Sequence, residues 1–103
     1  MANIFYETIF NQSGNTLGAW YPFHQANVPA SLEVTGIAGD TIQVRFSNKR
    51  PDVTPSGNES QYGADITTNG KVAITEPFGW IAILKTAGAS VVVVKLGSQQ
   101  MIQ

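Results

Sequence analysis

Short apolar runs with a two-residue period recur along this chain, and they constrain its fold more than any other feature. Leu32 and Val34, and then Ile42 and Val44, alternate with polar side chains, which is the pattern of strands with one buried face. β-Branched residues fill the apolar runs, and no apolar repeat of helical period extends beyond about two turns. The sequence therefore predicts an all-β chain.

Turn residues separate these runs into pairs that read as hairpins, since Asn69-Gly70 and small or glycine-rich segments stand between them. We expect three hairpins, formed by residues 30–35 with 41–47, 62–67 with 71–75, and 78–86 with 91–96. The last pair is apolar enough for central strands. Segment 1–10 is expected to be a strand buried on much of both faces, and segment 17–23, interrupted by Gly18 and Pro22, an edge or irregular strand.

About seven or eight short strands with frequent turns predict an antiparallel β-sandwich, jelly-roll or immunoglobulin-like. The pattern does not separate these two topologies. With 103 residues, the expectation is a single domain over residues 1–103. Within it, residues 48–60 are expected to form a long exposed loop, and residues 97–103 a tail that is either a flexible end or a contact arm.

Charge is scarce and evenly balanced. Six basic residues stand against seven acidic ones, and charged residues make up 13% of the chain, about half the usual share. Asn, Gln, Ser and Thr together supply 30 of the 103 residues. The basic residues are dispersed, so we expect no nucleic-acid partner. A surface with so little charge favours a chain packed within an assembly, although a weakly charged soluble domain remains an equal alternative.

Membrane insertion and secretion are not expected from the apolar segments. The longest of them, Trp80–Leu84 and Val91–Val94, are far shorter than the roughly 20 residues of a membrane-spanning helix. The first ten residues lack a basic region and include Glu7, so they do not resemble a signal peptide.

No constellation of catalytic or metal-binding residues is evident. His24 is the only histidine and there is no cysteine, and no nucleophile motif accompanies His24. Four acids, Asp40, Asp52, Glu59 and Asp65, could gather around Ca²⁺, but they lack the alternate-residue spacing of a calcium loop, so turn and loop roles are favoured. We expect no catalytic residue, metal or cofactor.

The two tryptophans differ in their surroundings. Trp80 lies in a strongly apolar run and is assigned to the core. Trp20 stands beside Tyr21 and Phe23 near Pro22, where core and contact surface remain alternatives. Exposed aromatic side chains stack on sugar rings or anchor partner proteins, so a sugar site would be sought first around Trp20.

Four segments together resemble small β-sandwich virion structural proteins of tailed bacteriophages: Ala30–Gly36, Gly39–Asn48, Ile66–Gly70 and Ile74–Thr86. The likeness spans about residues 20–96. It implies a structural protein that binds the major capsid protein or other virion proteins, is located on the capsid surface and forms a homo-oligomer. The 48–60 loop is longer than the brief loop of that pattern, which predicts a protein-specific contact there.

The leading functional hypothesis is therefore a capsid decoration or cement protein. Twelve residues are the candidate protein contacts: Ile4, Phe5, Tyr6, Trp20, Tyr21, Phe23, His24, Lys49, Arg50, Asp52, Asn58 and Glu59. The alternative is a carbohydrate- or receptor-binding module of a tail or fibre, which would use Trp20, Tyr21 and Trp80 as a stacking platform. An enzyme is the weakest reading, and it would need a pocket that joins His24 to two carboxylates.

Overall fold

Eight strands and no helix make up the described part of the chain in a computed structural model. It describes residues 2–23, 27–49, 53–56, 59–76 and 79–101, and of residues 2–5, 27–29 and 98–101 it describes the backbone. The strands are β1 (Ala2–Gln12), β2 (Tyr21–Pro22), β3 (Asn27–Thr35), β4 (Thr41–Ser47), β5 (Ser60–Ile66), β6 (Gly70–Ile74), β7 (Trp80–Ala87) and β8 (Val92–Met101).

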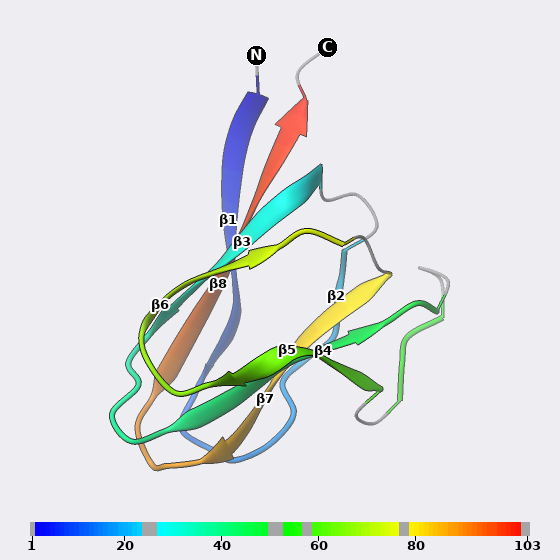
Figure 1. Cartoon of the computed structure of the whole chain (residues 1–103). Coiled ribbons are helices and arrows are strands. Elements are labelled where there is room, and N and C mark those ends of the chain that lie inside the picture. Colours follow the sequence, from blue (N-terminus) through cyan, green and yellow to red (C-terminus); the bar gives the residue numbers. More distant parts are fainter. Residues whose placement is uncertain (1, 24–26, 50–52, 57–58, 77–78, 102–103) are drawn as a thin grey trace.

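The strands form two four-stranded sheets (Figure 1), with the order β1-β8-β3-β6 in sheet A and β2-β7-β4-β5 in sheet B. The antiparallel pairs are nested along the chain, because β1 pairs with β8, β2 with β7, β3 with β6 and β4 with β5. This is the strand order of a jelly roll. The all-β sandwich is confirmed, and the strand order separates the two topologies that the sequence left open.

All three expected hairpins are wrong, although their strands exist. Each of the predicted turns connects a strand of one sheet to a strand of the other, as in the step from β3 to β4. The β3–β4 turn crosses next to the β7–β8 turn, where a Cβ atom on Gly36 would collide with the carbonyl oxygen of Val91. Among the named strands, the one consecutive pair within a sheet is β4 and β5, and the 48–59 segment connects them.

Alternation did identify the core correctly. Leu32 and Val34 of β3 are buried, and so are Val44 of β4 and Ile83 of β7, because the inward faces of the two sheets meet there. β7 and β8 are central strands of their sheets, as expected. Trp80 is buried, which confirms its assignment to the core.

Within the expected 48–60 loop, the described residues 48–49, 53–56 and 59 lie outside strands, and Ser60 begins β5. Val53 is exposed, whereas Pro55 is buried against the rest of the chain. In the part of the chain that the structure describes, no helix is long and apolar enough to cross a membrane.

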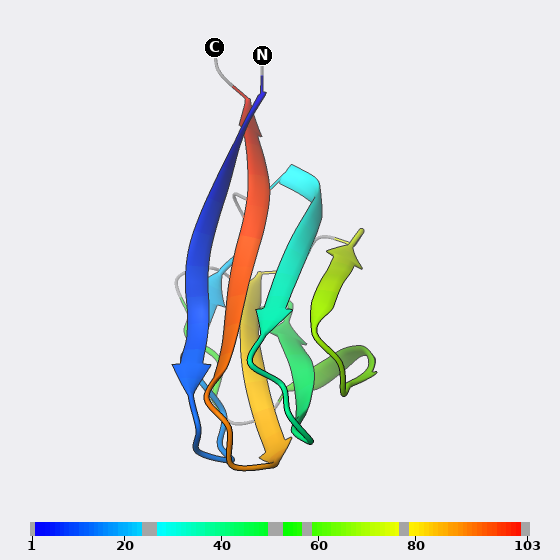
Figure 2. The ribbon, with the colours of Figure 1, turned by 90° about the vertical axis from the view of Figure 1, so that its left-hand side faces the viewer.

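An arm extends from sheet A past the end of sheet B where β7 begins (Figure 2), and β3 flanks it as far as the Asn27–Gln99 pair. We call the arm the paired segments 2–7 of β1 and 96–101 of β8, which run from the Glu7–Leu96 pair to the Ala2–Met101 pair. At about 3.4 Å per residue the arm is roughly 20 Å long. The chain therefore continues as strand through residue 101. The flexible-end alternative for the tail is wrong up to that point, and the contact-arm alternative stays a prediction.

The arm also changes the expectation that β1 is buried on both faces. Ile9 and Phe10 are buried, whereas Tyr6, Glu7 and Thr8 are exposed. Glu7 is paired with Leu96, whose side chain is buried, so its position belongs to the core-facing side of the sheet. Glu7 is nevertheless exposed, because β1 is an edge strand of sheet A.

Candidate functional site

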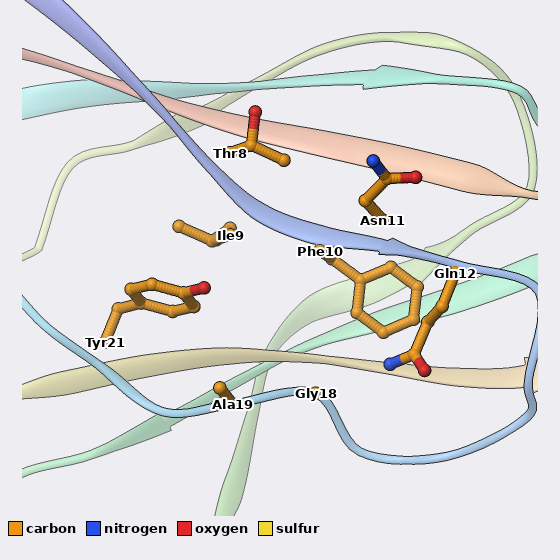
Figure 3. Close-up of a pocket in the computed structure, with 8 residues that line it drawn as sticks. All are labelled: Thr8, Ile9, Phe10, Asn11, Gln12, Gly18, Ala19 and Tyr21. Carbon is orange, nitrogen blue, oxygen red and sulfur yellow. The ribbon is translucent and has the colours of Figure 1, made fainter.

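A pocket of about 270 Å³ lies at one side of the sandwich, between β1 of sheet A and the segment that leads into β2 of sheet B. The lining residues are Thr8, Ile9, Phe10, Asn11, Gln12, Gly18, Ala19 and Tyr21. Both β1 and β2 are edge strands. The pocket is therefore a lateral opening between the two layers (Figure 3).

An irregular strand creates this opening. The segment before β2 runs along β7, where the Gly18 amide donates to the Ile83 carbonyl at 2.8 Å and Leu17 bridges to Leu84. Regular pairing returns only at Tyr21, opposite Ile81. The two residues between Gly18 and Tyr21 leave the ladder, as a bulge does. The expectation of an edge or irregular strand over 17–23 is thus confirmed.

The pocket combines an aromatic ring with uncharged polar groups. Ile9, Phe10 and Gln12 project from β1 into the space, and the hydroxyl of Tyr21 points into it from the opposite side (Figure 3). The lining residues include no Asp, Glu, His, Lys or Arg. Such a lining can hold an uncharged polar molecule by hydrogen bonds and ring contact, and it offers no acid–base pair.

The acids considered for Ca²⁺ are dispersed. Asp65 accepts hydrogen bonds from Gln43 at 3.1 Å and from Gln61 at 2.8 Å, on the outer face of sheet B. Glu59 forms a partly exposed ion pair with Lys49 at 3.6 Å, while Asp52 lies outside the described residues. Within the described ranges, no three His, Cys, Asp or Glu side chains gather as metal ligands.

The fourth acid, Asp40, is part of a buried ion pair. Its Oδ2 lies 3.2 Å from Nζ of Lys85, and both side chains are fully buried. Nζ of Lys85 also donates to the carbonyl oxygens of Gly88 at 2.7 Å and Ser13 at 3.0 Å, and to Oδ1 of Asn15 at 2.9 Å. The lysine therefore connects the three turns at the end of the sandwich opposite the arm (Figure 2).

Backbone amides hold the carboxylate of this pair in place. The Ala38 amide donates to Oδ1 of Asp40 at 2.8 Å, and the Ser90 amide donates to Oδ2 at 3.0 Å. These bonds, first that of Ala38, lower the pKa of Asp40 from 3.8 to about 2, while burial opposes the shift and Lys85 assists it. Removing one partner of such a buried pair leaves the other charge uncompensated in the interior, which is strongly destabilising.

A lowered pKa makes the contribution of Asp40 dependent on pH. In the unfolded chain the carboxyl takes up its proton near pH 3.8, but in the folded chain only near pH 2, so its stabilising contribution is complete above about pH 4 and is lost between these values. We expect the stability difference between the wild type and Asp40→Asn to shrink as the pH falls through this window, as urea unfolding would measure. A constant difference for Asp40→Asn would contradict the assignment.

Comparison with protein-family models, with curated proteins and with solved structures finds no match. The chain's own residues therefore carry the functional argument.

The candidate contacts fall on separate parts of the molecule. Ile4 and Phe5 lie in the arm, where their backbone is described, and Tyr6 follows them with 56% of its surface exposed. Trp20 and Tyr21 are half-buried at the pocket side. The residues His24, Arg50, Asp52 and Asn58 lie outside the described residues.

Two further candidates need revision. Phe23 is 1% exposed and belongs to the core, so its assignment as a contact residue is wrong. The Phe23 amide donates to the carbonyl of Gly79, the residue before β7, at 2.8 Å. Trp80 is buried as well, so it is not available to an exposed stacking platform with Trp20.

Sequence reasoning missed the Asp40–Lys85 pair and the pocket. A signal for the pair exists, because Lys85 follows Ile81 and Ile83 on the inward side of an apolar strand. A lysine at such a position is rarely buried without a carboxylate partner. The pocket has no comparable signal, because it depends on how one irregular segment pairs with β7.

Proposed function

We propose that the chain is a structural virion protein of a tailed phage, and specifically a capsid decoration or cement protein that binds and stabilises the shell. The support is the resemblance over residues 20–96 together with the jelly-roll strand order, a topology that viral capsid domains use. A shared fold does not by itself assign a function. The surface chemistry must therefore supply the rest.

The arm is the observation that carries the proposal. It projects beyond sheet B and presents the exposed Tyr6 on the edge strand β1. The opposite end of the sandwich is held together by the Asp40–Lys85 ion pair. One rigid end and one projecting end suit a protein that bridges neighbours. On a shell, many copies of a weak site add up through avidity.

The proposal is tested by adding the protein back to shells assembled without it. Purified chain should co-sediment with such shells, saturate at a fixed ratio to the capsid protein and raise their disruption temperature. A variant lacking residues 1–6, and retaining the wild-type circular dichroism spectrum, should bind more weakly, since it lacks most of one strand of the arm. A full-length chain that remains in the supernatant at all shell concentrations would refute the proposal.

A second candidate function is recognition of a sugar, and the edge pocket is the observation that favours it. Its volume of about 270 Å³ and its lining by Tyr21 and Gln12 suit a single polar ring. Lectin domains are among the proteins that use the jelly roll. The stacking platform considered from sequence is thereby reduced to Tyr21, with Trp20 as its neighbour.

We expect Tyr21→Phe or Gln12→Ala to weaken the binding of a monosaccharide at this pocket by about threefold to tenfold, the effect of one lost hydrogen bond. The measurement is a titration with glucose, galactose, mannose and N-acetylglucosamine, followed by NMR shifts of the Thr8–Gln12 amides. Gln43→Ala, on the outer face of sheet B, is the matched control. If none of the four sugars shifts these amides at saturating concentration, the sugar candidate is excluded.

A further inference from the structure

The four edge strands of the sandwich differ in how they resist pairing with another strand. An unpaired edge is a template for a further strand, and proteins usually blunt it with short strands, prolines, charges or bulges. β6 has five residues and carries Lys71, and β2 has two residues and ends in Pro22. β5 has a register shift against β4 and carries Asp65. Three of the four edges are thus protected.

The β1 edge has no such protection along its first seven residues. Residues 2–8 pair one for one with residues 95–101 of β8, and the register shift comes only between Thr8 and Phe10. No proline, lysine or arginine occurs in this stretch, and Glu7 is its one charge. β8 occupies one side of β1, and no described strand pairs with the other side. A straight seven-residue edge is therefore open.

We infer that this edge pairs with the same edge of a second copy, so that sheet A continues across a two-fold axis. Antiparallel pairing of the whole stretch 2–8 with itself has one register, in which position 5 lies on the two-fold axis. In this register the numbers of two opposed residues add up to ten, so that residue 2 faces residue 8 of the second copy. Closed two-fold contacts of this kind are the commonest in homo-oligomers. This inference does not depend on the proposed virion role.

The residue pairs created by that register favour the second copy as occupant. Ile4 stands opposite Tyr6 of the second copy, a β-branched–aromatic pair, and Asn3 stands opposite Glu7. The exposed ring of Tyr6 thereby gains a neighbour across the new interface. A register centred on Glu7 would oppose two carboxylates, which is unfavourable. The sequence of the edge is thus complementary to itself in the register that uses its full length.

The absence of cysteine allows a direct test with single-cysteine variants of the full chain. Across an antiparallel pair, opposed Cα atoms are about 4.5–5.5 Å apart, within the range that a disulfide spans. We expect Phe5→Cys to form a disulfide-linked dimer rapidly under mild oxidation. Thr8→Cys, whose two copies would be roughly 20 Å apart, and Ala73→Cys on the opposite edge of sheet A should cross-link slowly.

Mixing two different single-cysteine variants tests the register without a substitution at position 5, which lies on the two-fold axis. Asn3→Cys and Glu7→Cys should each remain monomeric on a non-reducing gel when alone, because their like positions would be roughly 14 Å apart, and should cross-link when mixed. Wild-type protein should be a dimer by light scattering. A monomeric wild type, with Phe5→Cys cross-linking no faster than Ala73→Cys and no product from the mixture, would overturn the inference. Faster cross-linking at Thr8→Cys than at Phe5→Cys would overturn the register.

Discussion

Replacing Lys85 by methionine is expected to lower the free energy of unfolding by about 3–5 kcal/mol, the usual cost of removing one partner of a buried ion pair. The ammonium group bonds Asp40 and three acceptors in the turns at one end of the sandwich. Methionine fills similar space but leaves the carboxylate without its counter-charge. Urea unfolding at neutral pH measures the loss.

The matched control for this substitution is Lys95→Met, which removes an exposed lysine from β8, the next strand along the chain, and should change stability by less than about 0.5 kcal/mol. The double variant Lys85→Met/Asp40→Asn should recover part of the loss, because no unpaired charge is left in the interior. If Lys85→Met and Lys95→Met proved equally stable, the buried network would not stabilise the fold as described.

Truncating Phe23 to alanine is expected to cost about 3–5 kcal/mol, as for other buried phenylalanines. Its side chain is 1% exposed and belongs to the main apolar cluster, so the variant leaves a cavity. Thermal unfolding followed by circular dichroism measures the loss. Tyr6→Ala serves as the comparison, because Tyr6 is 56% exposed and contributes through cross-strand contact, at about 1 kcal/mol or less.

The two aromatic substitutions also separate core from contact surface. Phe23→Ala should weaken self-association only in proportion to unfolding. Tyr6→Ala should weaken self-association directly and lower the melting temperature much less than Phe23→Ala does. A nearly unchanged melting temperature for Phe23→Ala would restore this residue to the set of contacts.

The contrast between strands and their pairing shows what the sequence could predict. A two-residue period reports which face of a strand is buried, and it placed Leu32, Val34 and Val44 in the core correctly. It carries no information on the neighbouring strand, because a turn such as that around Asn69 can either fold back within a sheet or step to the other one. Here the Asn69 side chain accepts a hydrogen bond from the Ile37 amide at 2.8 Å, which ties one inter-sheet turn to another.

The candidate site depends on features of the same long-range kind. The arm exists because the β1–β8 ladder continues past the end of sheet B (Figure 2), and the alternation of Ile4 and Tyr6 is the same whether or not a second sheet covers it. The ring of Tyr6 lies over Gly97, where a Cβ atom would be 2.6 Å from Cε1 of the ring. Such a cross-strand match is visible only once the register is known.

The central claim, that this chain is a structural component of a phage particle, is tested most directly by the protein content of purified virions. Particles of the phage that carries the gene would be banded by density, washed at high salt and quantified by mass spectrometry against the major capsid protein. The account predicts that the chain is present at a fixed ratio to the capsid protein and is accessible on the outside of the shell. Its absence from infectious particles, with all of the chain left in the soluble fraction of the lysate, would contradict the account.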